Sequence, residues 1–145
     1  MRSSQGRFHA SWTILKKFDV EGELGIANRF GGMHETDLWV ASTFRLKYFP
    51  WNNYLVTTVA LSVGLSYASH VADYEVSKSV VGHGNRLLAY LGPEITLALP
   101  SHPDWQLLVR IHHRSGGGIF WRDHGLFNGQ WAASQYLVAG VRHWF

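Results

Sequence analysis

The stretch from Ile111 to Gly118 contains the residues of this sequence that are best suited to chemistry. It reads Ile-His-His-Arg-Ser-Gly-Gly-Gly, so His113 and Ser115 stand two positions apart. Alternate residues of a β-strand point to one face of its sheet, which would bring the two side chains together. A serine hydroxyl beside an imidazole is the minimal pair of nucleophile and general base. Because a His-x-Ser pair is common by chance, spacing alone favours a polar strand end over a catalytic pair.

The glycines that follow Ser115 are candidates for a second part of such a site. Glycine adopts backbone conformations that other residues avoid, so consecutive N–H groups can be aimed at one point. Such groups stabilise the oxyanion that forms when a carbonyl is attacked. We therefore consider the backbone N–H groups of Gly116 and Gly117 as a candidate oxyanion hole.

Other kinds of chemistry have less support. The nine histidines include the neighbours His112 and His113, which would point to opposite faces of a strand, and acidic partners are scarce. Cysteine is absent. We therefore predict neither a metal site nor a cofactor. The formal net charge is +3, but the 13 basic residues are scattered and only Lys16 and Lys17 are adjacent, which argues against nucleic-acid binding.

The elements that position these residues are predicted to be strands, because period-two alternation of apolar and small polar residues runs along most of the chain. It is clearest at Tyr54–Tyr67 and Leu38–Tyr48. Pro50 to Asn53 lie between these two runs, and proline and asparagine favour a tight reversal. The pattern predicts a long β-hairpin.

A second hairpin is predicted from Leu87–Leu99 and Trp105–His113, with a turn at Pro100–Asp104. Pro93 lies inside the first of these strands and predicts a local irregularity, because proline has no N–H group to donate. If the hairpin is centred on His102, Glu94 lies opposite Arg110. We interpret these two residues as a structural ion pair on the inner face.

Three further strands are predicted, at Phe8–Ile14, Leu24–Phe30 and about Ala133 to Phe145. Two long loops, Ser69–Asn85 and Gly116 to about Ala132, separate strands in the second half of the chain. Nothing in residues 1–145 suggests a linker or a repeat, so we expect a single domain.

The composition bears on what surrounds these strands. The chain is 46% hydrophobic and 16% charged, whereas about 25% of the residues of an average soluble domain are charged. A soluble ligand-binding barrel would turn its apolar face inward, with Leu55, Val59, Leu61 and Leu107 inside. A membrane barrel would turn the same face toward lipid.

The less apolar face favours the membrane barrel. It carries Ser, Thr, Gly and Ala with a few isolated charges (Arg45, Glu94, Arg110 and Arg142), which suits a narrow interior better than a soluble exterior. The apolar face is flanked by aromatic residues of the kind found at membrane interfaces: Tyr48, Trp51, Tyr54, Tyr67 and Trp105. We predict an all-β fold, an antiparallel up-and-down transmembrane β-barrel of about eight strands.

The end of the chain indicates the compartment. Gly140 to Phe145 ends on phenylalanine after alternating apolar residues, with His143 where an aromatic residue is usual. This end resembles the C-terminal strand of bacterial outer-membrane barrels, which implies localisation in the outer membrane and recognition by the barrel-insertion machinery. The short turns and Phe145 would then face the periplasm. Only seven strands are read, whereas single-chain bacterial barrels have even numbers. An eighth strand and a signal peptide would precede this chain, or the region before residue 30 is miscounted.

The region from Ile111 to Phe145 resembles the lipid A 3-O-deacylases of the PagL type and their acyloxyacyl-hydrolase-like relatives. These proteins are eight-stranded outer-membrane barrels with a lipid-facing His-x-Ser motif late in the chain. The resemblance implies that His113 is the general base, that Ser115 is the nucleophile, and that an acyl ester of lipopolysaccharide is the substrate. Outer-membrane lipid and lipopolysaccharide are the implied partners, and protein partners are not indicated.

Two positions depart from the family pattern. Gly116 stands where the family has asparagine, and the family's acidic residue, a dozen positions beyond the serine, falls at Leu126-Phe127-Asn128. The nearest carboxylate is Asp123, which we take as the candidate third catalytic residue. An active enzyme should place Asp123 or Asn128 within hydrogen-bond reach of His113. The alternative is a barrel of the same ancestry without catalysis, with a structural or partner-binding role.

Overall fold

The computed structural model describes residues 2–15, 17–30, 35–70, 85–116 and 134–144, with the backbone path alone for 2–15, 29 and 30. The described residues form seven strands. They are β1 (Arg2–Leu15), β2 (Phe18–Phe30), β3 (Glu35–Leu46), β4 (Val56–Ala68), β5 (Leu87–Leu99), β6 (His102–Ser115) and β7 (Ser134–His143). None of the described segments is a helix long and apolar enough to cross a membrane.

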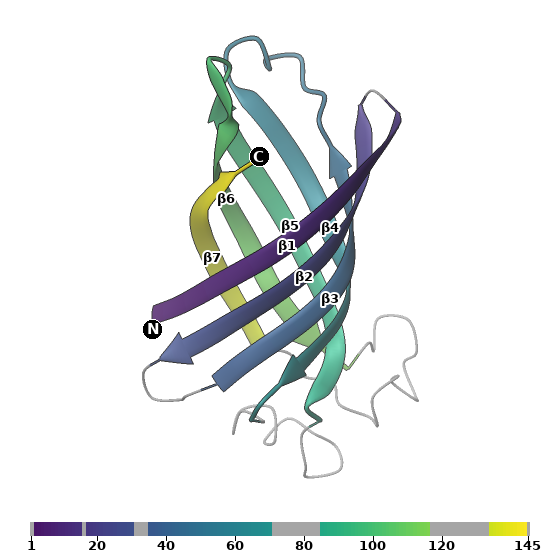
Figure 1. Ribbon diagram of the computed structural model, residues 1–145, viewed down its shortest axis with the longest axis vertical. Coiled ribbons are helices and arrows are strands. Elements are labelled where there is room, and N and C mark those ends of the chain that lie inside the picture. The colour runs from purple at the N-terminus through teal and green to yellow at the C-terminus, as the bar shows by residue number, and fades with distance from the viewer. Residues whose placement is uncertain (1, 16, 31–34, 71–84, 117–133, 145) are drawn as a thin grey trace.

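The seven strands form one antiparallel sheet in which every strand pairs with its neighbour in sequence. Figure 1 shows that the sheet curls strongly, so that β1–β3 lie in front of β4–β6. The pairings of the described strands end at β1 on one side and β7 on the other, and the sheet is not closed. The predicted all-β, up-and-down architecture is therefore confirmed.

The strand count agrees with the seven predicted from the sequence, but several ends differ. β5 has the predicted bounds, whereas β1 and β2 begin at Arg2 and Phe18, several residues before Phe8 and Leu24. The predicted turn at Pro100–Asp104 is too long, because β6 begins at His102. Near Pro93 the β5–β6 ladder passes from Leu91–His113 to Glu94–Arg110 without a change of register.

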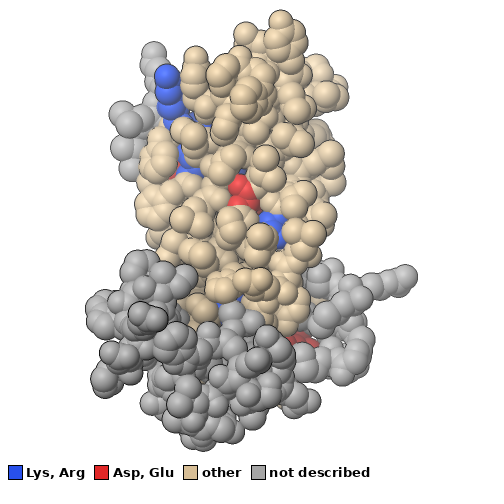
Figure 2. All heavy atoms as spheres, turned by 180° about the vertical axis from the view of Figure 1, so that it is seen from behind, with Lys and Arg blue, Asp and Glu red and all other residues tan. Residues whose placement is uncertain are grey.

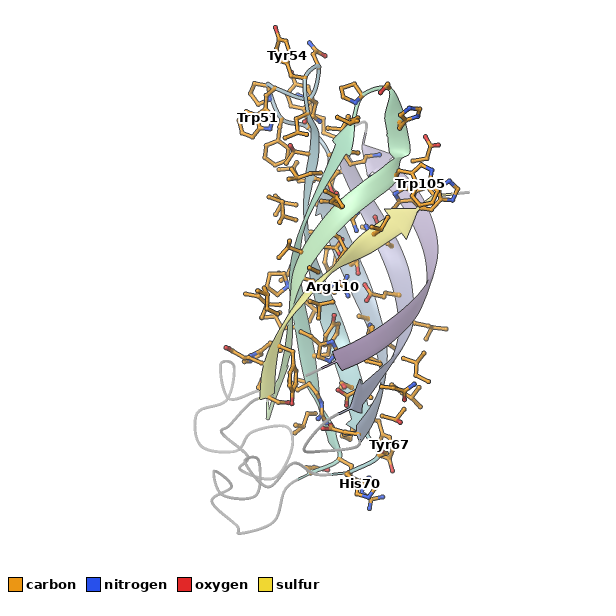
Figure 3. All side chains as sticks on the ribbon, turned by 90° about the vertical axis from the view of Figure 1, so that its left-hand side faces the viewer. Trp51, Tyr54, Tyr67, His70, Trp105 and Arg110 are labelled. Carbon is orange, nitrogen blue, oxygen red and sulfur yellow. The ribbon has the colours of Figure 1, made fainter. Side chains whose placement is uncertain are left out.

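The convex face of the sheet is apolar. Leu55, Val59, Leu61 and Leu107 are between 38% and 64% exposed, which excludes the alternative of a soluble barrel with these residues inside. In Figure 2 the described part of one face shows only a few charged atoms among uncharged residues. Aromatic side chains lie at both ends of this face: Trp51, Tyr54 and Trp105 at the end with the short turns, and Tyr67 at the other (Figure 3).

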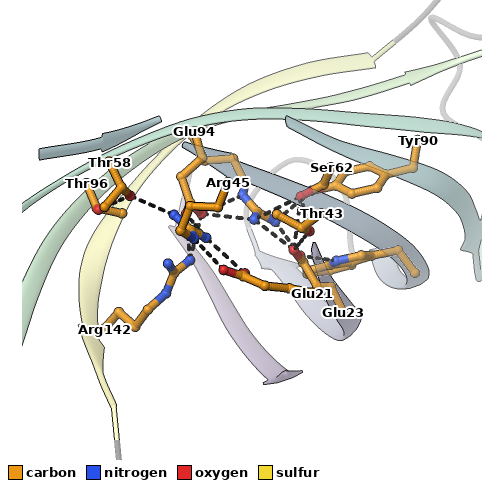
Figure 4. Close-up of polar contacts among 12 residues, drawn as sticks. Glu21, Glu23, Thr43, Arg45, Thr58, Ser62, Tyr90, Glu94, Thr96 and Arg142 are labelled. Atoms are coloured by element: carbon orange, nitrogen blue, oxygen red, sulfur yellow. Dashed lines mark hydrogen bonds and ion pairs between the residues drawn. The ribbon is translucent and has the colours of Figure 1, made fainter. Parts of the chain in front are cut away.

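The concave face carries buried charges that bond across the interior (Figure 4). The predicted pairing of Glu94 with Arg110 is present, with 2.9 Å between Oε2 and Nη2. Arg110 on β6 also donates to Glu23 on β2, at 2.8 Å from Nη2 to Oε2. Because β2 and β6 are not neighbours in the sheet, this bond shows that the sheet curls back on itself.

The sequence suggested a few isolated charges on the inner face, but in the structure these charges are bonded to one another. Arg45 donates from Nη2 to Glu21 at 3.1 Å and to Glu94 at 3.0 Å, and Arg142 donates to Glu94 at 2.7 Å. The prediction overlooked Glu21 and Glu23 because β2 begins earlier than expected. The resulting network has three carboxylates and three guanidinium groups, which compensate each other's charge.

Candidate active site

The last residues of β6 place His113 and Ser115 on the convex face. Both side chains are half-buried, and they alternate with buried neighbours on either side. They continue the outward row of Val109 and Ile111, which are 43% and 42% exposed. Their spacing along the strand is about 6–7 Å, which an imidazole ring can bridge. The predicted shared, apolar face of the pair is thus observed.

The residues between and before the pair hold the end of β6 from inside. The fully buried Arg114 donates from Nη1 to Glu35 Oε1 on β3 at 3.2 Å and from Nη2 to the backbone oxygen of Arg86 at 3.0 Å. His112 packs against Trp39 and Tyr90, with ring centroids 4.9 and 4.7 Å away. As predicted, His112 and His113 lie on opposite faces. These inward anchors fix the strand whose outward side chains form the pair.

The side chain of Gln135 contacts the His113 ring. Gln135 lies directly opposite His113 in the β6–β7 ladder, and its Nε2 is 3.0 Å from His113 Nδ1. Sequence reasoning missed this residue, because the connection between β6 and β7 is long and leaves their register open. A short turn, like the one between β5 and β6, would have revealed it.

The other residues considered for catalysis are described only in part. Gly116 follows β6 and is buried. Gly117, Asp123 and Asn128 lie outside the described residues, so the predicted oxyanion hole and the identity of an orienting acid stay predictions.

An apolar groove of about 560 Å³ lies on the convex face across β2–β5. Its β5 end is formed by Leu87, two residues before Ala89, which pairs with Ser115. Side chains in such diagonal positions of adjacent strands are about 7–8 Å apart. Ser115 is therefore a diagonal neighbour of Leu87, at the edge of the groove, and does not itself line the groove. The groove is lined by Leu24, Gly25, Ile26, Leu38, Trp39, Val40, Leu65, Tyr67 and Leu87.

In the described part of the chain, no group of three or more His, Asp or Glu side chains is arranged to hold a metal ion. Comparisons of the sequence and structure with protein-family models, curated proteins and solved structures gave no match. The resemblance to the lipid A deacylases therefore rests on the residues quoted above.

Proposed function

We propose that this chain is a β-barrel of the bacterial outer membrane that hydrolyses an acyl ester of lipopolysaccharide. His113 acts as the general base and Ser115 as the nucleophile. The observation that carries the proposal is the position of the pair. Both side chains lie at the end of a strand on the apolar outer face, where a lipid substrate would meet them without leaving the bilayer.

The distribution of polar and apolar residues supports the membrane part of the proposal. Outward residues such as Leu38, Val40 and Val63 are 44–52% exposed, whereas the inner face buries six mutually bonded charges. Membrane barrels have this arrangement, with an apolar outside, a polar inside and aromatic residues at both interfaces. The aromatic side chains at the two ends in Figure 3 agree with it.

The proposed reaction has two steps. His113 takes the proton of the Ser115 hydroxyl while Oγ attacks the ester carbonyl carbon, and the C–O bond to the sugar oxygen breaks. The imidazolium gives this proton to the departing sugar oxygen, which leaves as a hydroxyl. Water then attacks the acyl-serine with His113 again as base, the bond to Ser115 Oγ breaks, and the imidazolium returns the proton to Oγ as the fatty acid is released. In this proposal the acyl chain lies in the apolar groove, whose edge residue Leu87 is a diagonal neighbour of Ser115.

The test is fatty-acid release from lipopolysaccharide by the purified, folded chain, measured by mass spectrometry. Ser115→Ala should lower the rate by about a thousand-fold or more, because the nucleophile is lost. Ser42→Ala is the matched control, since Ser42 is an exposed serine on β3 that points to the same convex face of the sheet as Ser115. Equal release by the wild-type chain and Ser115→Ala would refute the assignment.

A non-catalytic barrel is the second candidate, and the contact of His113 supports it. The group at Nδ1 is an amide, whereas serine hydrolases of this kind have a carboxylate there that stabilises the imidazolium. This candidate predicts no acyl release by a correctly folded chain, under conditions in which an active lipid A deacylase releases fatty acid.

A further inference from the structure

The contact between β6 and β7 gives His113 a partner that no sequence motif indicates. Gln135 Nε2 lies 3.0 Å from His113 Nδ1, and the two residues are direct cross-strand neighbours. We propose that Gln135 is the positioning residue of the His113–Ser115 pair: after a half-turn of the amide, its oxygen takes the place of Nε2, accepts the Nδ1–H and so leaves the ring's Nε2 free to take the serine proton. This inference rests on the proposed hydrolase function.

The chemical argument concerns the tautomer of the ring. A neutral imidazole carries one proton, and the hydrogen bond at one nitrogen decides which nitrogen holds it. A half-turn of an amide exchanges its oxygen and its NH₂ group at nearly the same distance. With the oxygen toward His113, the proton sits on Nδ1 and Nε2 is basic. With the NH₂ group toward His113, as in the 3.0 Å contact, the ring's Nε2 is protonated and cannot act as the base, so the two orientations correspond to an active and an inactive ring.

The position of Gln135 is set by the sheet. Ser134, the residue before it, is buried opposite Arg114, and Arg142 near the other end of β7 donates to Glu94 at 2.7 Å. Two rigid strands therefore hold the ring and its partner, which positions groups better than a loop does.

The lipid-facing position also explains why an amide can serve there. A charged carboxylate is costly against hydrocarbon, whereas a neutral amide can orient the ring at a lower cost. The disadvantage is that an amide cannot neutralise the imidazolium that forms during the reaction. The proposal therefore predicts a slow enzyme, whose rate a carboxylate at this position would raise.

The tautomer can be measured directly on the full chain in detergent micelles. Two-bond ¹H–¹⁵N correlation spectra of histidine-labelled protein distinguish the Nδ1–H and Nε2–H forms, and the signals of His113 are those lost in His113→Gln. We expect the Nδ1–H form in the wild-type chain and a shift toward Nε2–H in Gln135→Met, which keeps the size of the side chain. Leu137→Met, two residues further along the same outward face, should change nothing.

A second pair of measurements uses catalysis. Gln135→Met should lower kcat about ten-fold with little change in KM, whereas Gln135→Glu should raise kcat about ten-fold. Gln135→Glu should also move the acidic limb of the pH–rate profile to higher pH, because a neighbouring carboxylate favours the protonated ring and the base must be neutral.

The outcomes separate the two proposals. An Nε2–H tautomer in the wild-type chain, or a tautomer that Gln135→Met leaves unchanged, overturns the positioning role whatever the activity. The expected tautomer shift without fatty-acid release by any variant overturns the hydrolase and leaves the contact of Gln135 with the ring supported. Loss of the folded-barrel signal would identify a variant that fails to fold, and Gln135→Glu then provides the second reading of the tautomer.

Discussion

Glu94 joins distant parts of the sheet, because it accepts hydrogen bonds from arginines of three different strands. Arg45 reaches it from β3, Arg110 from β6 and Arg142 from β7. Leaving one partner of a buried ion pair alone typically costs about 3–5 kcal/mol. A single carboxylate at this point therefore fixes the relative positions of strands that the sheet ladder does not join.

Besides pairing their charges, the inner residues must fit into a limited space, as Gly25 shows. A Cβ atom at this position would lie 2.1 Å from the ring of Trp39, whose indole N–H donates to Glu23 at 2.7 Å. We predict that Gly25→Ala lowers the free energy of unfolding by about 1–3 kcal/mol, because the buried indole cannot move without losing this bond. Urea unfolding followed by tryptophan fluorescence measures the change.

The matched control is Gly140→Ala on β7, where an added Cβ meets nothing within 4 Å. This variant should stay within about 0.5 kcal/mol of the wild-type chain. Equal effects of the two substitutions would contradict the packing of Trp39 over Gly25.

At the scale of the element, the side chains of β6 point alternately to the inner and the outer face of the sheet. Its inward Arg114 holds the strand to Glu35 on β3 and to the backbone of Arg86 just before β5, and its outward residues carry the candidate chemistry. We predict that Arg114→Gln speeds amide hydrogen exchange at residues 112–115 and lowers kcat about ten- to hundred-fold, since small displacements of reacting groups are costly. Mass-spectrometric hydrogen exchange and the fatty-acid assay check the two effects.

Lys47→Gln is the control, because it tests whether the loss of any ion pair would speed amide exchange at residues 112–115. Lys47 pairs with Asp19 at 2.7 Å, but its side chain is 33% exposed and lies at the other end of the sheet. Such pairs contribute about 0–1 kcal/mol. An equal rise in exchange at residues 112–115 in both variants would rule out a specific role for Arg114.

The same element shows what the sequence can and cannot predict. Alternation alone assigns the faces of β6, and the short turn before it fixes the register that places Arg110 opposite Glu94. The long connection after it carries no such constraint, so Gln135 could not be placed beside His113. On β2, the acidic residues Glu21 and Glu23 lie outside the strand predicted from the sequence, and they pair inside with Arg45 of the neighbouring β3 and Arg110 of the distant β6.

At the scale of the whole molecule, the described side chains are polar inside the sheet and apolar outside it, which makes the surrounding medium testable. We predict that Val63→Arg, in the middle of β4, lowers the free energy of unfolding in lipid vesicles by about 2–4 kcal/mol, because the charge would face hydrocarbon. Leu55→Arg, beside the short turn, should cost about 0–1 kcal/mol because it would face the interface. Both wild-type side chains are exposed, at 44% and 38%.

A chain surrounded by water would tolerate both arginines equally, since exposed substitutions there change stability by about 0.5 kcal/mol or less. The difference between the two variants is therefore the quantity to measure, by urea titration in vesicles of one lipid composition. No difference would contradict the membrane assignment while leaving the fold unchanged.

The network inside the curled sheet has an electrical consequence. Its carboxylates and guanidinium groups are buried and compensate each other's charge, so they leave no net charge to attract an ion. We expect the folded chain to add no measurable conductance to a planar lipid bilayer. A lipid substrate of the proposed reaction would then reach His113 and Ser115 by lateral diffusion within the membrane leaflet around the sheet.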